Sequence, residues 1–321
     1  MQKTNKVTLS VVVPVYREEK GIVEFMKRVK PVLLSMTQDF EIIFAMDRSP
    51  DGTEQEIEKQ IAADGRVKLL TFSRRVGQDM ASLAGLKYST GAAVILMDVD
   101  MQDPPELITE MVAKWKEGND VVRAQRLTRD GEMLSRRIAA YLFYWVVNRI
   151  SDPPIPRNTG HYCLMTRRVV DEINKMKEGH GFIRGMISLA GFNQTVIKFN
   201  RPARATGTGN YNRVFGSLTN AITGIVGFSD YPLKIFTWSG FFIAFSSFCA
   251  GILYAILKLA GMPFASGNPT IVILIFFMGG VQLLSVGILG EYIGRIYQEV
   301  KQRPKYIIDR AVGFSDDTIK S

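Results

Sequence analysis

The chain has 321 residues, of which 46% are hydrophobic and 22% charged, and its formal net charge is +9 at pH 7. A chain of this size can hold one α/β domain of about 200 residues together with a membrane segment. The positive charge suits anionic lipid, a phosphorylated substrate or nucleic acid. The uncharged segments described below favour the first two, so no nucleic-acid partner is expected. Cys163 and Cys249 fit no CxxC or Cys/His spacing and indicate neither a disulfide framework nor a zinc site. No signal peptide is expected in the polar start MQKTNKVTLS.

Strand-like and helix-like segments alternate along the first part of the chain. Strands are predicted at 9–15, 41–45, 67–72, 94–97 and 121–124, and helices at 19–35, 53–63, 78–89 and 105–117. Such alternation is typical of a mostly parallel, doubly wound sheet, whose usual ligands are nucleotides. Neither GxGxxG nor GxxxxGK[ST] occurs, so a metal ion and basic side chains are expected to hold the phosphates.

The most informative segment is AAVILMDVDMQDPPE at 92–106. Its apolar run is typical of a strand buried on both faces, and it ends in Asp98, Asp100 and Asp103, at the edge where open α/β sheets bind ligands. Asp-x-Asp can hold Mg²⁺ or Mn²⁺, with a diphosphate and water completing the coordination. Asp103, just before Pro104, also suits the N-cap of a helix, a role that leaves the other two carboxylates unexplained.

Two uncharged segments predict membrane spans at 235–257 and 269–290, since roughly 20 apolar residues cross a bilayer. A short link joins them, so we expect a transmembrane hairpin within 235–290. Lys234 precedes the first span, and Arg295, Lys301 and Arg303 follow the second, which predicts that both termini are cytoplasmic. Two aromatic, apolar helices are expected to lie in the membrane interface, one at about 136–150 and one within 211–234.

Three motifs at predicted strand ends resemble glycosyltransferases of family 2, which have the GT-A fold. They are VPVYREE at 13–19, MDRSPDGT at 46–53 and DVDMQDPPE at 98–106. Asn158-Thr159-Gly160 before a strand, Arg201-x-x-Arg204-x-x-Gly207 after a later strand, and GEYIGRIYQEVKQRP at 290–304 resemble the polyprenyl-phosphate branch, which includes bactoprenol glucosyltransferases and dolichol-phosphate mannose synthases. The resemblance covers nearly the whole chain. It implies a GT-A, Rossmann-like head at 1–210, the hairpin, and a cytoplasmic C-terminal tail at 291–321.

The resemblance also implies a role for individual residues. Pro14, Tyr16 and Glu18 would line the nucleoside pocket, Asp47 would read the base or ribose, and Asp98 would lie near the sugar. Asp100 and Gln102 would hold Mg²⁺ or Mn²⁺ on the diphosphate. Five arginines would bind the lipid phosphate, because a guanidinium group stays charged and can bind phosphate in bidentate fashion. For each of them, the alternative is a solvated position on the surface. They are Arg126, Arg129, Arg136, Arg201 and Arg204.

The chain departs from the family pattern at three places. Met46-Asp47-Arg48-Ser49 stands where Asp-Asp-Gly-Ser is usual, Gly209-Asn210 where Ser/Thr-Lys is usual, and His161 where relatives have Asp or a similar residue. That Asp is a candidate general base in relatives. A phosphomonoester with a second pKa of about 6 is already largely a dianion at neutral pH and scarcely needs a base. His161 is therefore either a hydrogen-bond donor to phosphate or a structural residue.

These observations predict an inverting, metal-dependent transferase (EC 2.4) whose candidate catalytic residues are Asp98, Asp100 and His161. It would be integral to the inner or plasma membrane, with a cytoplasmic catalytic domain. It would move one sugar, expected to be glucose from UDP-glucose, to undecaprenyl phosphate, and the resemblance implies a homo-oligomer. The alternatives are an amino- or formamido-sugar donor, or a catalytically silent membrane scaffold. A processive polysaccharide synthase is not expected, because the QxxRW motif is absent.

Overall fold

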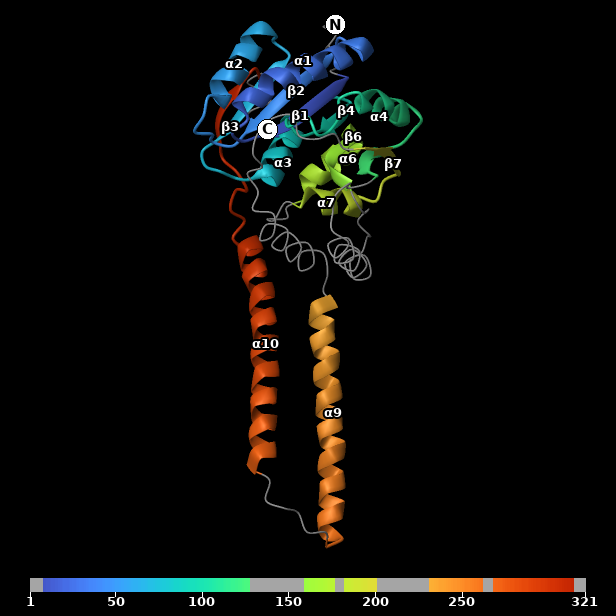
Figure 1. Ribbon diagram of the computed structural model, residues 1–321, viewed down its shortest axis with the longest axis vertical. Helices are drawn as coiled ribbons and strands as arrows, with labels where there is room; N and C mark the ends of the chain where they lie inside the picture. Colours follow the sequence, from blue (N-terminus) through green and yellow to red (C-terminus); the bar gives the residue numbers. More distant parts are fainter. Residues whose placement is uncertain (1–7, 128–158, 177–181, 201–230, 262–267, 315–321) are drawn as a thin grey trace. The chain divides into compact units, whose positions relative to one another are not determined.

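The computed structural model describes residues 8–127, 159–176, 182–200, 231–261 and 268–314 (Figure 1). The chain divides into two compact units. The head comprises Met1–Ala221 and Pro304–Ser321, and the helical unit comprises Ile222–Arg303. The head therefore contains sequence from both sides of the helical unit. The predicted interfacial helices at about 136–150 and within 211–234 fall almost wholly outside the described residues.

The head is built on one sheet of eight strands in the order β7-β5-β6-β4-β1-β2-β3-β8. The four strands β4, β1, β2 and β3 run parallel to one another, as predicted, whereas β6 is antiparallel to both of its neighbours. The order of the strands reverses beside β1, which makes the gap between β1 and β4 a topological switch point where such sheets bind ligands. The strands are β1 (Leu9–Val15), β2 (Phe40–Met46), β3 (Val67–Phe72), β4 (Ala93–Leu96), β5 (Val121–Arg126), β6 (Thr159–Thr166), β7 (Gln194–Phe199) and β8 (Ile308–Val312).

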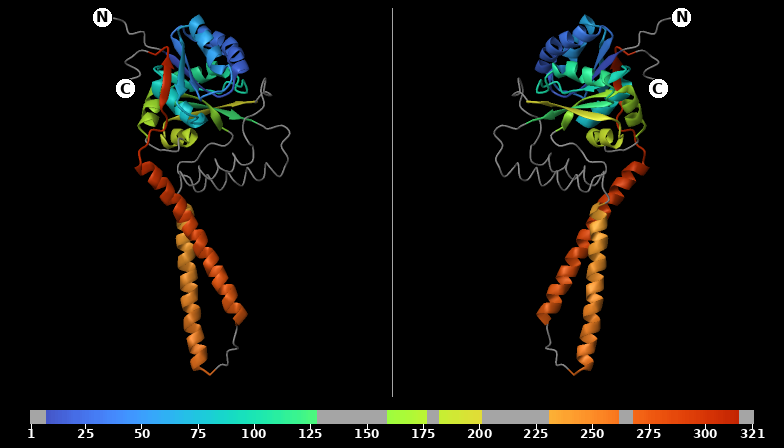
Figure 2. Two further views of the ribbon diagram at one scale, coloured as in Figure 1. Left: turned by 90° about the vertical axis from the view of Figure 1, so that its left-hand side faces the viewer. Right: turned by 90° about the vertical axis from the view of Figure 1, so that its right-hand side faces the viewer.

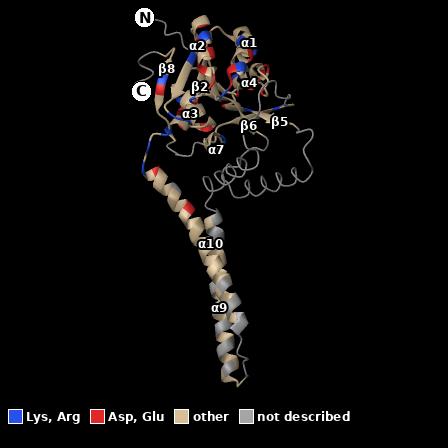
Figure 3. Cartoon of the chain, turned by 60° about the vertical axis from the view of Figure 1, so that its left-hand side comes forward, with Lys and Arg blue, Asp and Glu red and all other residues tan. Residues whose placement is uncertain are grey.

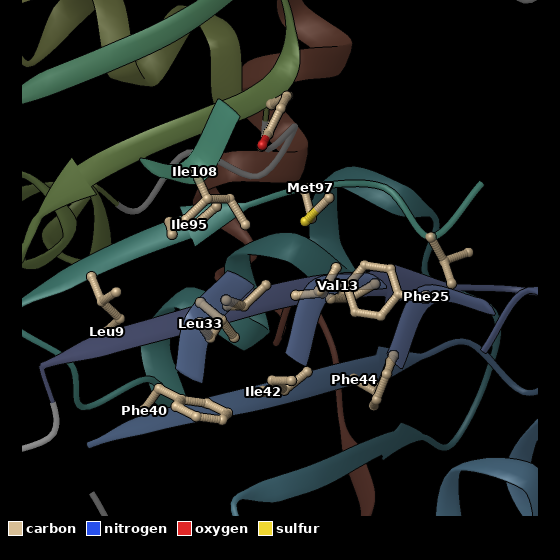
Figure 4. Packing of buried hydrophobic residues seen from close by; sticks show 14 of the residues in the cluster. Leu9, Val13, Phe25, Leu33, Phe40, Ile42, Phe44, Ile95, Met97 and Ile108 are labelled. Carbon is tan, nitrogen blue, oxygen red and sulfur yellow. The ribbon is translucent and has the colours of Figure 1, made fainter. Parts of the chain in front are cut away.

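Helices cover both faces of the sheet. On one face, α1 (Glu19–Met36) turns an apolar stripe at helical spacing onto the strands, and α2 (Thr53–Ala63) and α4 (Leu107–Lys116) join the same core. Figure 4 shows Phe25 and Leu33 of α1 packed over strand residues such as Val13 and Phe44. On the other face lie α3 (Gln78–Tyr88), α6 (Arg167–Lys175) and the short α7 (Ile183–Leu189).

One glycine explains how closely α3 approaches the sheet. A Cβ atom added at Gly85 would lie 2.3 Å from Cγ1 of Val12 in β1. Only glycine allows that approach without displacing the strand. The contact fixes α3 over β1, and it therefore fixes the position of the residues at the start of α3.

The predicted N-cap role of Asp103 is wrong. The helix begins at Leu107, with Glu106 at the N-cap position, because residues 104–106 form a turn in which Leu107 N–H donates to the carbonyl of Pro104 (3.2 Å). Tyr162 Oη also donates to that carbonyl, at 2.9 Å. Burial raises the pKa of Tyr162 well above its ordinary value. The turn is thus fastened to β6.

The segment after the helical unit returns to the head and adds a strand to the sheet. β8 pairs antiparallel with β3, and Leu69 lies opposite Val312. Tyr306 packs edge-on against Phe72, with ring centroids 5.8 Å apart, and Phe314 does the same against Tyr88, at 6.0 Å. β8 covers the edge of β3 and leaves fewer backbone groups unpaired.

The helical unit contains two long helices, α9 (Tyr231–Leu259) and α10 (Asn268–Val300), each drawn as a continuous helix in Figure 2. At 1.5 Å per residue they are about 44 and 50 Å long, more than the ~30 Å hydrocarbon core of a bilayer. Trp238, Phe242 and Leu283 are each at least 70% exposed. Figure 3 shows that the acidic residues of α10 lie toward its C-terminal end.

Within the described residues, one helical segment, Phe277–Val300, is long and apolar enough to cross a membrane. It overlaps the span predicted at 269–290. The span predicted at 235–257 is helical within α9 but lacks that support, so the two-helix transmembrane hairpin stays a prediction.

Candidate functional site

A cavity of about 520 Å³ lies at the carboxyl ends of β1, β2 and β4, next to the switch point. Parallel strands end at the same edge of a sheet, which is why motifs far apart in the sequence meet here. Seven of the residues expected to form the site line this cavity: Pro14, Tyr16, Glu18, Asp47, Asp98, Asp100 and His161.

Asp98 and Asp100 follow β4 and both face the cavity. Gln78 Nε2 donates to Asp98 Oδ1 at 2.7 Å, and the backbone N–H of Gln102 donates to Asp100 Oδ1 at 3.2 Å. Met101 has φ 57°, a left-handed conformation that is uncommon outside glycine. Such strained backbone is often found at functional sites. The chain turns sharply here and keeps both carboxylates at the strand end.

This pair of carboxylates suits a divalent metal on a diphosphate. Among the described residues, no three His, Cys, Asp or Glu side chains cluster closely enough to form a metal site by themselves. Mg²⁺ is usually held by one or two carboxylates, with the remaining ligands from water and substrate phosphates. Asp98 and Asp100 fit that arrangement. Gln102 contacts Asp100 through its backbone and does not line the cavity, so its role as a metal ligand stays a prediction.

Asp47 fastens the loop that precedes α3. It is 3% exposed, and its two oxygens accept the backbone N–H groups of Val76 (2.8 Å) and Gly77 (2.9 Å). Gly77 has φ 88°, which favours glycine. Asp47 therefore has a structural role that the sequence did not reveal, and its contact with a nucleoside stays a prediction.

Tyr16 lies between two cations at the end of β1. The guanidinium carbon of Arg75 is 4.1 Å from the centroid of the Tyr16 ring, and that of Arg17 is 5.3 Å away. Arg17 also has a left-handed backbone, with φ 57°, so the chain turns sharply after β1 as it does after β4.

The MDRSPDGT motif forms a turn followed by the start of helix α2, a structure that its Ser, Pro, Asp and Gly residues favour. Asp51 Oδ1 accepts hydrogen bonds from the hydroxyls of Ser49 and Thr53, both at 2.7 Å. Partial burial of Asp51 opposes its ionisation, but the bonds from Thr53 and Ser49 outweigh it and lower the pKa. Ser49 Oγ in turn accepts the N–H of Arg17 (2.8 Å), which ties this turn to the end of β1.

Comparison with known proteins decides the family. The model of the family described as Glycosyl transferase family 2 matches residues 10–173. The chain is 41% identical over 305 residues to a bactoprenol glucosyl transferase of Shigella phage SfII, covering 94% of this chain and 98% of the relative. It is 38% identical over 307 residues to a protein of Bacillus subtilis named glycosyltransferase YkcC, covering 96% and 95%. The chain belongs to glycosyl transferase family 2.

Solved structures also resemble the head of this family 2 enzyme. A crystal structure of glucosyl-3-phosphoglycerate synthase from Mycobacterium tuberculosis, in complex with Mn²⁺, UDP and phosphoglyceric acid, is 18% identical, with a TM-score of 0.48, covering 68% of this chain and 78% of that one. The family and the observed sheet together identify the head as a GT-A, Rossmann-like α/β fold with a mostly parallel sheet, as predicted.

His161 lines the cavity from β6. Its Nε2 lies 2.9 Å from Oδ1 of Asp79, at the start of α3. Apart from this contact, that buried oxygen has no hydrogen-bond partner among the described residues. His161 is therefore one half of an acid–imidazole pair rather than a lone histidine.

Most of the predicted phosphate-binding arginines cannot be placed. Arg129, Arg136, Arg201 and Arg204 lie outside the described residues. Arg126 ends β5 and does not line the cavity; its Nη2 is 3.9 Å from Oδ1 of Asp103, which is 1% exposed. The acceptor contacts of these arginines stay predictions.

Four polar or charged residues that line the cavity were not foreseen: Arg75, Gln78, Asp79 and Arg184. The first three follow β3 and could have been found with the rule that located Asp98, because β3 is parallel to β1 and ends at the same edge. Arg184 lies on the seven-residue helix α7, in a part of the chain with no recognisable motif.

Proposed function

We propose that this family 2 glycosyltransferase transfers one glucose from UDP-glucose to undecaprenyl phosphate at the cytoplasmic membrane face, with inversion at the anomeric carbon. The observation that carries the proposal is the pair Asp98 and Asp100 in a cavity at the switch point of the sheet, in a chain that also has long apolar helices. The name of the Shigella phage relative supports the glucose and the lipid carrier.

On the donor side, Asp98, Asp100 and Gln102 would hold Mg²⁺ or Mn²⁺. An ion held by these residues would supply positive charge that offsets the charge developing on the departing nucleoside diphosphate. Pro14, Tyr16 and Glu18 would line the nucleoside pocket. Tyr16 is well suited to this, because the stacked Arg75 holds its ring.

On the acceptor side, the phosphate of the lipid would be the nucleophile. At neutral pH it is largely a dianion, so it can attack the anomeric carbon without first losing a proton to the protein. A single in-line displacement would give a β-linked lipid-phosphate sugar from an α-linked donor, with no covalent enzyme intermediate.

The sheet supports a paired membrane crossing. Residues 304–314 return to the head that residues 8–200 build, since β8 pairs with β3. A chain that leaves the cytoplasmic side and returns to it must cross the membrane an even number of times. α9 and α10 are each long enough for one crossing, which favours the hairpin and cytoplasmic termini. Self-association is a further prediction, drawn from the family resemblance.

The test uses purified full-length protein in lipid nanodiscs with undecaprenyl phosphate and Mn²⁺. UDP-glucose, UDP-galactose, UDP-N-acetylglucosamine and a formamido-sugar nucleotide are supplied in turn, and the lipid extract is analysed by mass spectrometry. The proposal predicts undecaprenyl phosphoglucose from UDP-glucose and no product with excess EDTA. Product from another donor alone would identify a related transferase. The absence of both metal-dependent UDP binding and product from any donor would favour the silent scaffold, whose donor site would have decayed.

A further inference from the structure

The cavity must hold a second phosphate if the proposed function is correct, and the inference below rests on that function. Its lining is rich in carboxylates, which would repel a phosphate that is not shielded by a metal ion. A second anion must therefore lie beside a basic side chain. Among the described residues, three basic side chains line the cavity: Arg75, His161 and Arg184. Arg75 is stacked on Tyr16 at the end of β1, which leaves the other two.

Arg184 has a hydrogen-bond donor that no described residue accepts. Its Nη1 lies 3.5 Å from the carbonyl oxygen of Thr159, a long contact, and its guanidinium lies 5.2 Å from the ring centroid of Phe182. Its Nε is buried and has no hydrogen-bond partner among the described residues. A guanidinium with an unused donor at the wall of a cavity suits an anionic ligand, because a buried donor without a partner is unfavourable.

His161 lines the cavity, and one of its ring nitrogens contacts Asp79. Its Nε2 lies 2.9 Å from Oδ1 of the Asp79 carboxylate, an ion-pair distance for a protonated imidazole. Within the described part of the chain, Asp79 is the one residue that contacts the imidazole nitrogens, which leaves Nδ1 for a ligand. A protonated imidazole between Asp79 and a phosphate would be a cation between two anions.

The two basic residues meet at β6. His161 is part of this strand, and Arg184 approaches the carbonyl of Thr159, two residues earlier. We infer that Arg184 and His161 together bind the phosphate monoester of the acceptor, and that Asp79 is a positioning residue that orients His161. The ligand class is a phosphate monoester dianion, carried either by an isoprenyl lipid or by free phosphate.

The first experiment measures binding rather than turnover. Full-length protein in detergent is titrated with farnesyl phosphate, inorganic phosphate and UDP with Mn²⁺, using isothermal calorimetry. Arg184→Gln should weaken farnesyl phosphate binding about 10- to 100-fold, the usual effect of losing a hydrogen bond between charged groups, while UDP affinity stays within about twofold. Arg184→Lys keeps the positive charge but removes the planar guanidinium group, so it should lose less farnesyl phosphate affinity than Arg184→Gln. Arg168→Gln is the matched control, because Arg168 is exposed, stacks on Phe192 and does not line the cavity.

Each outcome decides a separate point. Unchanged farnesyl phosphate affinity in Arg184→Gln would overturn the inference, and so would loss of UDP affinity alone, since the arginine would then belong to the donor diphosphate. Inorganic phosphate that binds as tightly as farnesyl phosphate would assign the site to free phosphate and overturn the lipid assignment. Binding of farnesyl phosphate that depends on Arg184, in a protein that makes no lipid-linked sugar, would support the inference and refute the proposed function.

A double-mutant cycle tests the role of Asp79. Asp79→Asn should raise the acceptor KM several-fold with kcat and UDP affinity nearly unchanged, and Asp79→Glu should restore part of the loss. In a His161→Ala background, Asp79→Asn should have no further effect, because residues that act through one another are not additive. Additive losses, or a fall in UDP affinity, would mean that Asp79 does not act through His161.

Discussion

A buried polar network at the opposite edge of the sheet gives a sharp stability prediction. Glu41, at the start of β2, is 1% exposed. Its carboxylate accepts hydrogen bonds from Ser10 Oγ, from Thr90 N–H (2.7 Å) and from Lys68 Nζ (2.6 Å). These bonds join β1, β2, β3 and the turn before β4.

Replacing Glu41 with Gln keeps the shape and removes the charge. The NH₂ group of the glutamine would face a hydrogen-bond donor at a position where a carboxylate oxygen accepted a hydrogen bond. Lys68 would also lose its counter-ion. Breaking a buried ion pair by removing one partner costs about 3–5 kcal/mol. Because the Lys68 side chain is 17% exposed and can recruit water, we expect the lower end, about 3 kcal/mol in the free energy of unfolding.

The pH dependence of this loss follows from the pKa of Glu41. Burial raises the pKa, but the hydrogen bonds from Lys68 and Ser10 outweigh it, so the pKa in the folded protein lies below the ordinary value of 4.5. A carboxyl group with a lowered pKa stabilises the fold above its unfolded pKa and loses that contribution as the pH falls through the folded value. The difference between wild type and Glu41→Gln should therefore be full at pH 7 and shrink below pH 4.5.

Urea unfolding of the full-length protein in detergent measures this difference. Trp115 packs against the core of the head, so its fluorescence reports on this unit once Trp145 and Trp238 are replaced by Phe. The control is Glu56→Gln, the same substitution in an i,i+3 pair whose Lys59 side chain is 72% exposed, which should change stability little. Equal losses in the two variants, or a Glu41→Gln loss that is unchanged at pH 3, would refute the reasoning.

Three further predictions concern the site and the sheet edge. His161→Ala should raise the acceptor KM about tenfold. The acid limb of its pH–rate profile should stay near pH 6, where the phosphate ionises. A fall of several orders of magnitude in kcat, with both substrates still bound, would instead make His161 an essential base. Arg126→Lys and Arg204→Lys should lower activity if either arginine grips phosphate in bidentate fashion, and unchanged kinetics in both would leave them as ordinary charges. Tyr306→Ala should lower the free energy of unfolding of the head by about 1–3 kcal/mol through loss of its contact with Phe72, as measured by urea unfolding. An unchanged midpoint would mean that this contact adds no stability.

The central strands could be predicted because burial on both faces leaves a plain signal. β1 and β4 are continuous apolar runs that end in polar residues, and their observed bounds differ from the predicted ones by at most one residue. Because parallel strands end at the same edge of a sheet, the residues that follow β1 and β4 could be expected to meet, and Tyr16, Asp98 and Asp100 do line one cavity.

The edge of the sheet could not be predicted from local pattern. β8 is five residues long, is half exposed, and pairs with a strand more than 200 residues away, so it leaves neither an apolar run nor a local partner in the sequence. Helix α7, which carries Arg184, has only seven residues and is too short to show an amphipathic pattern in the sequence. Asp103 was misjudged as a cap because Pro104-Pro105 suits a turn as well as a helix start.

The pairing of His161 with Asp79 depends on tertiary structure. The two residues are 82 positions apart in sequence, on β6 and α3, and each looks ordinary alone. They meet because Gly85 lets α3 lie close against β1, which sets the start of that helix beside the end of the sheet.

We propose that Asp100 helps to hold the metal on the diphosphate of a sugar donor. The most direct measurement is the rate of transfer of radiolabelled glucose from UDP-glucose to undecaprenyl phosphate by wild type and Asp100→Asn, together with their affinity for farnesyl phosphate. The account predicts a loss of about 100- to 1,000-fold in kcat for the variant, typical of lost electrostatic stabilisation of the transition state, with unchanged farnesyl phosphate binding. Full turnover by Asp100→Asn, or by wild type in excess EDTA, would contradict it.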